Sequence, residues 1–419
     1  MMKTKAVRLY GVKDLRLDEF ELPKITADEI LMKIVSDSLC MSSYKAAELG
    51  GDHARVPNDV AANPIIIGHE FCGEIVEVGE NWKGQFHAGQ KAAVQPALNL
   101  PGSPQALGYS YSLCGGDATY VILPKECMTQ GCLLPYSGES FFDGSLAEAL
   151  ACVCCAIHSM FHTPSKEVYG HEMGIKEGGN MVMMAAVGPM GLAAIDYTIH
   201  CDRRPGRLVI TDIDQTRLDR AAKLLTKEEA ARNGVELHYV NTRDIDAYAV
   251  LMELSEGRGY DDAIVFAPVP AVVELCDSVL GMDGCMNFFS GPADPTFSSK
   301  INLYNVHYKG THICGSAGSN TTDMKECLDM ISEGKLTPAF LVTHIGGLNC
   351  AIEATLHLPK IPGGKKLIYT HVDMPLTAIA DFAELGKTDP FYAKLAELTE
   401  KTHGLWNAEA ERFLLAEKT

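Results

Sequence analysis

Residues 63–79 read Asn63-Pro64-Ile65-Ile66-Ile67-Gly68-His69-Glu70-Phe71-Cys72-Gly73-Glu74-Ile75-Val76-Glu77-Val78-Gly79, and this stretch decides how the first part of the chain folds. Three isoleucines run into a Gly-His-Glu turn, and the alternation that follows predicts a second strand. His69 and Glu70 are therefore expected side by side on rigid backbone. Imidazole nitrogen and carboxylate oxygen both suit Zn²⁺, which takes three protein ligands and one open position in a catalytic site. Taken alone, the pair is more typical of an ordinary hydrogen-bonded turn, so the missing ligands must be sought elsewhere.

Length and charge limit the classes of protein to consider. A chain of 419 residues is too long for one ordinary core, which indicates two large domains or one domain with a substantial insertion. The formal charge of −18 argues against nucleic acid and anionic membranes as partners. It does not exclude a small anionic substrate, because charges are screened over about 8 Å at physiological salt and a local basic pocket can act independently.

The N-terminus and the cysteines indicate a cytoplasmic protein. Residues 1–9 lack the apolar core of a signal peptide, and the longest unbroken apolar runs are far shorter than a membrane span. The 14 cysteines are scattered, partly on apolar stretches, which is typical of thiols in a reducing compartment rather than of a disulfide framework.

Cys40 is the second candidate metal ligand. Short strands are predicted over residues 6–9, 15–17 and 29–35, and the last of them leads to Cys40 just before a helix that Ser42 or Ser43 would cap. A helix N-terminus lowers the pKa of a thiol, and the thiolate is the form that binds metal. Alone, Cys40 is more typical of a small buried hydrophobe.

Glu148 is the third candidate. Residues 141–158 predict a helix that is apolar nearly all round and is capped by Ser145, and Glu148 is the only acid after that cap. A lone carboxylate on a buried helix is costly unless a cation meets it. Hydrogen bonds from loop amides to Glu148 explain it equally well.

A dinucleotide-binding turn is predicted in the middle of the chain. Residues 180–196 indicate a buried strand, a turn containing Gly188, Pro189, Met190 and Gly191, and a helix. Glycines there let the backbone approach a pyrophosphate, which then meets the positive end of the helix. The first position of the usual G-x-G-x-x-G motif is Ala186, so the motif is degraded.

The next predicted strand bears on the choice of cofactor. It ends at Asp212, 21 residues after Gly191, where a carboxylate that binds the ribose is expected. A carboxylate accepts from the ribose 2′-hydroxyl and repels a 2′-phosphate, so NAD(H) is favoured over NADP(H). Arg217, five residues after Asp212, keeps binding of the phosphorylated cofactor NADP(H) possible.

The remaining pattern predicts a parallel sheet with helices on both faces, because strands and helices alternate. The strands are expected at residues 237–240, 261–267 and 284–290, and the helices between them at 218–233 and 270–280. A further helix is expected at residues 322–333, in the last third of the chain. Residues 161–179 are polar and indicate a surface insertion, whose His162 and His171 are not at the spacing of metal ligands.

Three motifs resemble, in their order and approximate spacing, those of the zinc-dependent medium-chain dehydrogenases, the group of alcohol and sorbitol dehydrogenases. The resemblance continues to about residue 369. The motifs are Cys40-x-Ser42, Gly68-His69-Glu70 and Leu146-x-Glu148-x-Leu150. The resemblance implies that Cys40, His69 and Glu148 bind one catalytic zinc, that Glu70 is a near or exchanging ligand, and that Ser42 passes the alcohol proton.

The same resemblance implies an α/β fold of two domains. A β-rich GroES-like catalytic domain would take residues 1–156 and 317–419, and a Rossmann coenzyme domain with a doubly wound parallel sheet would take residues 157–316. It also implies a homo-oligomer, a dimer or a tetramer. Residues 382–415 predict a helical tail that most members lack, and the sequence does not decide whether it packs on its own domain or on another subunit.

Two departures from the family pattern matter. Many members bind a structural zinc through four closely spaced cysteines, but this chain has only Cys114 between Gln95 and Tyr120, so we expect no structural zinc. The family often has a histidine five residues after the ligand cysteine as the outer end of a proton relay. Lys45 occupies that place, and an amine relays a proton only through a depressed pKa or a water molecule. Lys45 therefore either relays the proton or touches cofactor or substrate.

Four further stretches resemble the bacterial sugar-phosphate reductases of this family: residues 37–43, 63–74, 287–292 and 362–366. This resemblance implies reduction of the ketone of L-sorbose 1-phosphate to D-glucitol 6-phosphate. The alternatives are a dehydrogenase of an unphosphorylated polyol or secondary alcohol, and a non-catalytic nucleotide-binding protein. The basic candidates for a phosphate site, each more typical of a solvated surface charge, are Lys45, His53, Arg55, Lys365 and Lys366.

Overall fold

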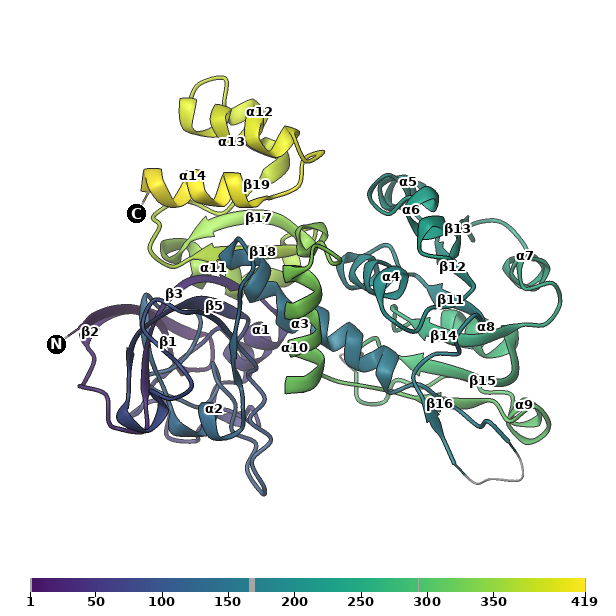
Figure 1. The fold of residues 1–419 in the computed structure, drawn as a ribbon, viewed down its shortest axis with the longest axis horizontal. Coiled ribbons are helices and arrows are strands. Elements are labelled where there is room, and N and C mark those ends of the chain that lie inside the picture. The colour runs from purple at the N-terminus through teal and green to yellow at the C-terminus, as the bar shows by residue number, and fades with distance from the viewer. Residues whose placement is uncertain (1, 166–169, 293, 419) are drawn as a thin grey trace. The chain divides into compact units, whose positions relative to one another are not determined.

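The chain folds into two compact units in the computed structural model, which describes residues 2–165, 170–292 and 294–418 (Figure 1). Unit 1 comprises Met1–Ala149 and Asn320–Thr419, and unit 2 comprises Leu150–Ser319. The chain thus leaves the first unit once and returns to it. The expectation of an α/β fold with a β-rich domain and a Rossmann domain is confirmed.

Unit 1 is built on two sheets, in which the chain's first and last thirds are paired. A three-stranded sheet has the order β2-β1-β4, and an eight-stranded sheet has the order β19-β17-β18-β3-β5-β6-β8 with β7 also paired to β3. The strands are β1 (Lys3–Gly11), β2 (Asp14–Glu21), β3 (Ile30–Ser38), β4 (Ile65–Ile66), β5 (Phe71–Val78), β6 (Lys91–Val94), β7 (Tyr120–Leu123), β8 (Leu133–Pro135), β17 (Val342–Gly347), β18 (Lys365–Tyr369) and β19 (Thr377–Ala378).

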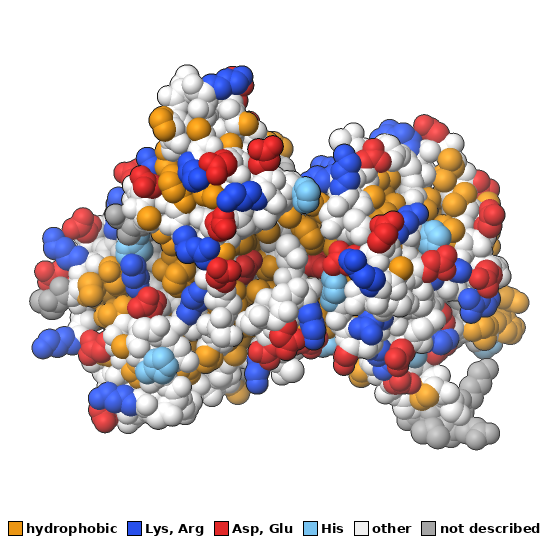
Figure 2. Space-filling view, turned by 45° about the horizontal axis from the view of Figure 1, so that its top comes forward, with side chains coloured by type: hydrophobic (Ala, Val, Ile, Leu, Met, Phe, Trp, Pro, Cys, Tyr) orange, Lys and Arg blue, Asp and Glu red, His pale blue; other side chains and the backbone are white. Residues whose placement is uncertain are grey.

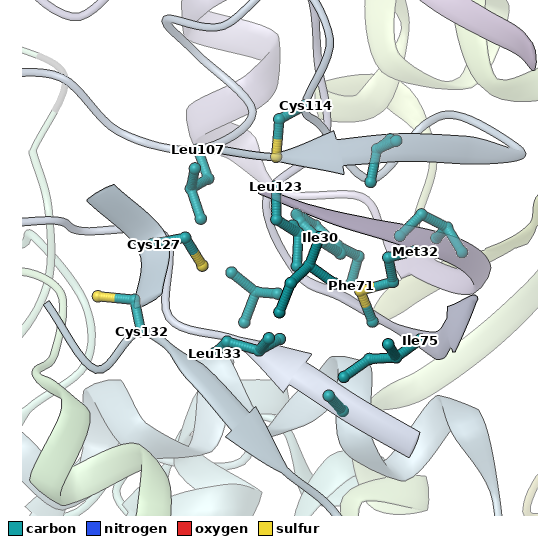
Figure 3. Packing of buried hydrophobic residues seen from close by; sticks show 14 of the residues in the cluster. Ile30, Met32, Phe71, Ile75, Leu107, Cys114, Leu123, Cys127, Cys132 and Leu133 are labelled. Carbon is teal, nitrogen blue, oxygen red and sulfur yellow. The ribbon is translucent and has the colours of Figure 1, made fainter. Parts of the chain in front are cut away.

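One apolar core cluster of unit 1 lies where β3 and β5 pair. Side chains of Ile30, Met32, Phe71 and Ile75 point toward one another there, together with apolar side chains from neighbouring strands and loops (Figure 3). Burying aliphatic and aromatic side chains of this size stabilises the fold by about 1.5–3 kcal/mol each. The core fixes β3 and β5, and the candidate ligands follow the end of one and precede the start of the other.

The turn between β4 and β5 requires glycine. Gly68 has φ +92°, and a Cβ atom on it would lie 2.6 Å from both the Asp117 amide nitrogen and Asp37 Oδ2. Only glycine tolerates both the backbone conformation and the close approach. The predicted strand, Gly-His-Glu turn and second strand are all present.

The helices of unit 1 lie before, between and after these strands. They are α1 (Met41–Leu49), α2 (Lys125–Thr129), the first half of α3 (Phe141–His158), α10 (Thr321–Ser332), α11 (Ala351–Leu356), α12 (Phe382–Leu385), α13 (Pro390–Glu400) and α14 (Ala408–Lys418). The prediction of one helical tail is corrected to three short helices, since turns at residues 386–389 and 401–407 interrupt it.

The helix that carries Glu148 begins before its predicted cap. α3 starts at Phe141, so Ser145 is not its cap but lies inside it, where its hydroxyl donates to the Phe142 carbonyl at 2.9 Å. By length and composition α3 could cross a membrane, but 72% of it is buried inside the protein. That burial is typical of a core helix.

Unit 2 contains a six-stranded parallel sheet of the Rossmann type. Its order is β13-β12-β11-β14-β15-β16, which reverses direction between β11 and β14 as doubly wound sheets do. The strands are β11 (Asn180–Met184), β12 (Arg207–Asp212), β13 (Glu236–Asn241), β14 (Tyr260–Val265), β15 (Leu280–Phe288) and β16 (His312–Cys314). The helices are α4 (Pro189–His200), α5 (Gln215–Leu224), α6 (Lys227–Arg232), α7 (Ala247–Leu254), α8 (Pro270–Val279) and α9 (Leu303–Lys309).

Two element boundaries in unit 2 differ from the predictions. The helix expected over 218–233 is two helices, because Leu225 is not helical (φ −120°, ψ 89°) and the Thr226 side chain caps α6 by accepting from the Glu229 amide. The strand expected from residue 284 begins at Leu280 and has an irregularity in its pairing with β14. The periodicity of apolar residues revealed neither the Thr226 cap of α6 nor the irregular pairing of β15 with β14.

The polar stretch 161–179 contains a short hairpin of β9 (Phe161–His162) and β10 (Glu172–Met173), while residues 166–169 lie outside the described part. His162 is buried, and its ring nitrogens lie 3.0 Å from Asp262 Oδ1 and 3.1 Å from the Asp283 carbonyl oxygen. His171 packs against Phe161 in a tilted arrangement, with 4.4 Å between ring centroids. These contacts give both histidines a structural setting within unit 2.

Candidate metal and cofactor sites

Three of the predicted metal ligands converge in unit 1. Cys40 follows β3, and His69 and Glu70 form the turn before β5. One potential ligand atom from each, a sulfur, a ring nitrogen and a carboxylate oxygen, lies within 4.8 Å of the other two. Strand pairing between β3 and β5 brings these residues together, although 29 residues separate Cys40 from His69.

The expected effect of the helix on Cys40 is corrected. Cys40 itself is the N-cap of α1, with no side-chain capping hydrogen bond, so neither Ser42 nor Ser43 caps the helix. Burial raises the pKa of the Cys40 thiol, and the nearby Lys365 ammonium opposes this only in part. In the protein without metal, desolvation therefore outweighs the helix N-terminus, and a cation is needed to favour the thiolate.

His69 is held by two hydroxyl groups. Its Nδ1 lies 3.0 Å from the Ser43 hydroxyl and 3.0 Å from the Tyr109 hydroxyl. Burial lowers the pKa of His69, so the neutral imidazole that can bind a metal is favoured. Sequence reasoning missed Tyr109. Its one local signal is Gly108, which has φ +74° and packs against the Gly68 carbonyl so closely that a Cβ atom would lie 1.9 Å from that oxygen.

Glu70 is paired with Lys365, a contact that the sequence analysis missed. The Lys365 ammonium binds both carboxylate oxygens of Glu70, at 2.6 Å for Oε2, and both side chains are nearly buried. Burial opposes ionisation of Glu70, but the Lys365 charge and His69 outweigh it, and the pKa of Glu70 lies below its usual value. Lys365 is therefore not a solvated surface charge, and Glu70 is the neutralised carboxylate of the cluster.

Glu148 lies on α3 and is buried beside the same cluster. Burial, together with the negative charge of Glu70, raises the pKa of Glu148 to about 7, and Cys40 adds to this effect. Glu70 thus opposes ionisation of both Cys40 and Glu148, and Cys40 also opposes ionisation of Glu148, with Lys365 as the neighbouring cation. A divalent cation would relieve this repulsion, because it favours the charged forms of thiol and carboxylate.

The donor set fits zinc. Thiolate, imidazole and carboxylate are its usual ligands at about 2.0–2.3 Å, and donor atoms that gather within 4.8 Å can close on one ion. Two nitrogen or sulfur donors argue against Mg²⁺ and Ca²⁺, which prefer oxygen ligands throughout.

A pair of buried acids supports the turn from below. Asp37 Oδ1 accepts from the Glu70 amide at 3.1 Å, whereas Asp37 Oδ2 and both carboxylate oxygens of Asp117 are buried without a hydrogen-bond partner among the described residues. Burial raises the pKa of Asp117 to about 7 and that of Asp37 well above its usual value. The pair therefore stays largely neutral and can sit under Glu70 without adding a full charge.

The predicted catalytic residues Ser42 and Lys45 lie in the first two turns of α1, both exposed. Burial raises the pKa of both Cys40 and Tyr109, and Ser42 opposes part of each rise, so its hydroxyl lies close to both side chains. Lys366, another basic candidate, is buried and donates to three carbonyl oxygens, those of residues 361, 362 and 364. The Lys366 ammonium group therefore uses its three hydrogen bonds on backbone carbonyl oxygens.

The predicted cofactor turn in unit 2 has the expected geometry. Gly188 is the N-cap of α4, Pro189 is its first residue, and Met190 and Gly191 complete the first turn. A Cβ atom on Gly191 would lie 2.1 Å from the Ala186 carbonyl oxygen, so a glycine is required for helix and strand to pack. The free amide groups at this helix end are suited to a pyrophosphate.

Asp212 and Arg217 flank the end of β12. Asp212 is its last residue, and Oδ1 accepts from the amides of Ile213 and Asp214 at 2.8 and 3.0 Å. These bonds fix the carboxylate while leaving Oδ2 for another donor. Arg217 lies in α5 with an exposed side chain 3.8 Å from Asp214 Oδ2.

Two family models match the chain. Residues 26–134 match the alcohol dehydrogenase GroES-like domain, and residues 189–333 match the zinc-binding dehydrogenase domain. The first range includes Cys40, His69 and Glu70, and the second begins at Pro189 in the cofactor turn.

Curated relatives match along nearly the whole length. The chain is 49% identical to mannitol-1-phosphate 5-dehydrogenase of Aliivibrio fischeri and 45% identical to L-sorbose 1-phosphate reductase of Klebsiella pneumoniae. It is also 52% identical to the uncharacterized protein YggP of Escherichia coli K12. Each alignment covers 99% of this chain and 98% of the relative.

Solved structures share the fold at lower identity. The 2R,3R-butanediol dehydrogenase of Bacillus subtilis matches with a TM-score of 0.67 at 24% identity, covering 88% of this chain and 99% of that one. Galactitol-1-phosphate dehydrogenase of Escherichia coli matches with a TM-score of 0.65 at 20% identity, covering 87% and 100%.

Proposed function

Because this chain belongs to the zinc-dependent medium-chain dehydrogenases, we propose that it transfers a hydride between a nicotinamide cofactor and the ketone or alcohol of a sugar phosphate. It is a zinc-dependent dehydrogenase of the sugar-phosphate or polyol type. The observation that carries the proposal is the convergence of Cys40, His69 and Glu70 in unit 1, with Glu148 buried beside them.

We propose that Cys40, His69 and Glu148 hold one catalytic zinc. When bound, zinc would supply a Lewis acid that polarises the substrate oxygen. Glu70 is bound on both oxygens by Lys365, which supports a role as a neighbouring or exchanging ligand rather than a permanent one. Cys114 packs in the apolar core near Cys127 and Cys132, so the proposal includes no structural zinc.

Ser42 is the proposed proton carrier. Its hydroxyl neighbours Cys40 and Tyr109 and is exposed, so it can donate a proton to the substrate oxygen, or accept one, and exchange it with solvent. Lys45 lies three residues further along α1, on the same side of the helix, where a relay would continue. The structure of α1 is equally compatible with contact between Lys45 and the substrate.

The cofactor is proposed to bind at the turn Gly188, Pro189, Met190 and Gly191, with its ribose at Asp212. The carboxylate of Asp212 supports NAD(H), and the exposed Arg217 on the next helix keeps NADP(H) open. The nicotinamide supplies or accepts the hydride, and the protein contributes position and electrostatics.

The proposed substrate pair is L-sorbose 1-phosphate and D-glucitol 6-phosphate. It is supported by 45% identity to the Klebsiella reductase, while 49% identity to the Aliivibrio enzyme makes mannitol 1-phosphate a second candidate of the same class. A dehydrogenase of an unphosphorylated polyol would use the same ligands. A non-catalytic nucleotide-binding protein would bind NADH without zinc, and the ligand cluster argues against it.

A substrate panel tests the proposal. Turnover is followed at the NADH absorbance with L-sorbose 1-phosphate, mannitol 1-phosphate, sorbose and sorbitol, with and without a chelator, and bound zinc is measured in the same samples. We expect turnover of a phosphorylated substrate that the chelator abolishes, and loss of zinc and turnover together in Glu148→Ala. Full activity of Glu148→Ala with unchanged zinc would remove Glu148 from the ligand set.

We further propose a homo-oligomer in the cytoplasm, with no nucleic-acid or membrane partner. Leu303 and Tyr308 on α9 are 74% and 61% exposed, which is unusual for apolar side chains of their size and supports a subunit contact there. Acidic and basic side chains are interspersed over the face seen in Figure 2, as expected for a chain of charge −18 that does not bind a polyanion. Light scattering after gel filtration measures the oligomeric state.

A further inference from the structure

Two basic side chains pack against one tyrosine next to the candidate ligand His69. His53 stacks on the Tyr109 ring at 5.7 Å between centroids with 7° between the planes, and the Arg55 guanidinium carbon lies 5.5 Å from the same centroid. The Tyr109 hydroxyl is 3.0 Å from His69 Nδ1. One aromatic ring therefore links the basic groups to the metal cluster.

Lys45 completes the basic group. Its charge reaches His53, since Arg55 and Lys45 both contribute, after burial, to lowering the pKa of the His53 imidazole. Arg55 also acts on His69 and Tyr109. The three basic side chains thus share one small region of unit 1.

The charges of Lys45 and Arg55 have no carboxylate within 4.0 Å in the described part of the chain, and the lowered pKa of His53 favours its neutral imidazole. Among the described residues, the ion pairs at 4.0 Å or less include neither Lys45, His53 nor Arg55. By contrast, Lys365 is paired with Glu70, and Lys366 is bound by backbone carbonyls. In a chain with 54 acidic and 36 basic residues, basic groups that repel one another without a carboxylate partner indicate a missing anion.

We propose that Lys45, His53 and Arg55 bind the phosphate group of the substrate, with Tyr109 as the spacer between that phosphate and the reacting carbon. A phosphate monoester carries nearly two negative charges at pH 7, and the planar guanidinium of Arg55 can bind two of its oxygens at once. The inference rests on the proposed function, and it assigns Lys45 to the substrate rather than to the proton relay.

The test compares Arg55→Gln with the wild-type enzyme on L-sorbose 1-phosphate and on L-sorbose. Losing one charge-assisted hydrogen-bonding group should raise KM for the phosphorylated substrate about 10- to 100-fold, with kcat within about twofold, and leave the slow turnover of free sorbose unchanged. Arg55→Lys keeps the positive charge but not the planar guanidinium that binds two oxygens at once. Its KM for L-sorbose 1-phosphate should therefore lie between those of the wild-type enzyme and Arg55→Gln. Lys24→Gln, at an exposed lysine of the same unit, is the matched control and should change neither substrate.

Other outcomes of this experiment overturn the inference. An equal change in KM for L-sorbose 1-phosphate and L-sorbose would show that Arg55 has a structural role. A rise in KM for NADH alone would show that Arg55 binds a phosphate of the cofactor instead of the substrate phosphate. Binding of inorganic phosphate, measured by calorimetry on the zinc-loaded enzyme, separates this inference from the proposed function. If no sugar phosphate is turned over, phosphate binding that Arg55→Gln weakens at least tenfold still supports the subsite, and equal binding by both proteins overturns it.

Discussion

Lys365 neutralises Glu70 across 295 residues of sequence, and this single contact sets the charge of the candidate metal site. Glu70 is 1% exposed, so its carboxylate is shielded from bulk water. A buried carboxylate without its partner charge is strongly destabilising, whereas an intact buried pair contributes little net stability.

Lys365→Met should therefore lower the free energy of unfolding by about 3–5 kcal/mol, because it leaves the Glu70 carboxylate buried and unpaired. Adding Glu70→Gln should recover most of that loss. Urea unfolding of the two single variants and the double variant measures both effects. Lys387→Met, which removes one member of an exposed ion pair with Glu384, should change little, and a loss there as large as that of Lys365→Met would contradict the explanation.

Asp143 in the first turn of α3 should make the protein less stable as the pH rises. Burial raises the pKa of Asp143 to about 7, from about 4 in the unfolded chain. The folded state therefore holds this proton more tightly than the unfolded chain does. The resulting contribution of Asp143 to the free energy of unfolding is complete below about pH 4. It is lost between about pH 4 and pH 7, by about 1.4 kcal/mol per pH unit.

Asp143→Asn should remove this dependence and so gain stability over the wild-type protein between pH 5 and pH 8. Urea midpoints at each pH measure the difference, with Asp329→Asn on the exposed face of α10 as the control. Parallel pH profiles for the wild-type protein and Asp143→Asn would show that Asp143 titrates normally.

At the scale of elements, the C-terminal tail holds the start of α3. Glu411 on α14 accepts from the amides of Phe141 and Phe142 at 2.7 and 2.8 Å, and from the Tyr369 hydroxyl at 2.9 Å. Phe141 is the first residue of α3, and Glu148 follows it by two turns, about 10 Å along the axis. Tyr369 ends β18, the strand that begins with Lys365. The tail thus fixes both elements that bring charged groups to the site.

Glu411→Gln should lower the free energy of unfolding by about 1–3 kcal/mol, because a neutral amide loses the charge-assisted bonds to a helix N-terminus. The same variant should bind zinc more weakly if Glu148 is a ligand. Chemical unfolding and zinc titration measure the two effects. Arg412→Gln, the next residue on α14 with an exposed partner in Glu139, should leave both unchanged, and equal effects in the two variants would contradict the capping role.

Element boundaries show where sequence patterns failed. α3 begins at Phe141 rather than at Ser145 because the cap comes from Glu411, 270 residues away from Phe141. The break between α5 and α6 depends on the Thr226 hydroxyl at one amide. Periodicity finds the apolar face of a helix, but its ends depend on hydrogen bonds that any nearby or distant acceptor can make.

At the scale of the molecule, the two units separate the two chemical tasks. The candidate ligands all lie in unit 1, and the residues proposed for the cofactor all lie in unit 2. Loss of metal should therefore act on one unit only.

Chelator treatment should abolish turnover and lower the thermal midpoint of unit 1, because the thiol and the two carboxyl groups are then left without a shared cation. The transition of unit 2, identified by its response to NADH, should not move. Differential scanning calorimetry with and without chelator measures both transitions, and zinc, but not Mg²⁺, should restore the first. An unchanged calorimetric profile and full activity after chelation would exclude a zinc site.

The sequence by itself determined the alternation of strands and helices, the glycine-dependent turns at Gly68 and Gly191, and the order of the candidate ligands Cys40, His69 and Glu148. These features follow from neighbours along the chain, through side-chain periodicity and allowed backbone angles. Only the tertiary structure decided the pairing of Glu70 with Lys365, the contact of Tyr109 with His69, and the cap that Glu411 places on α3. The physical reason is that each of these contacts joins segments far apart in sequence, and only the packing of the strands and helices decides which side chains meet in the buried space between them.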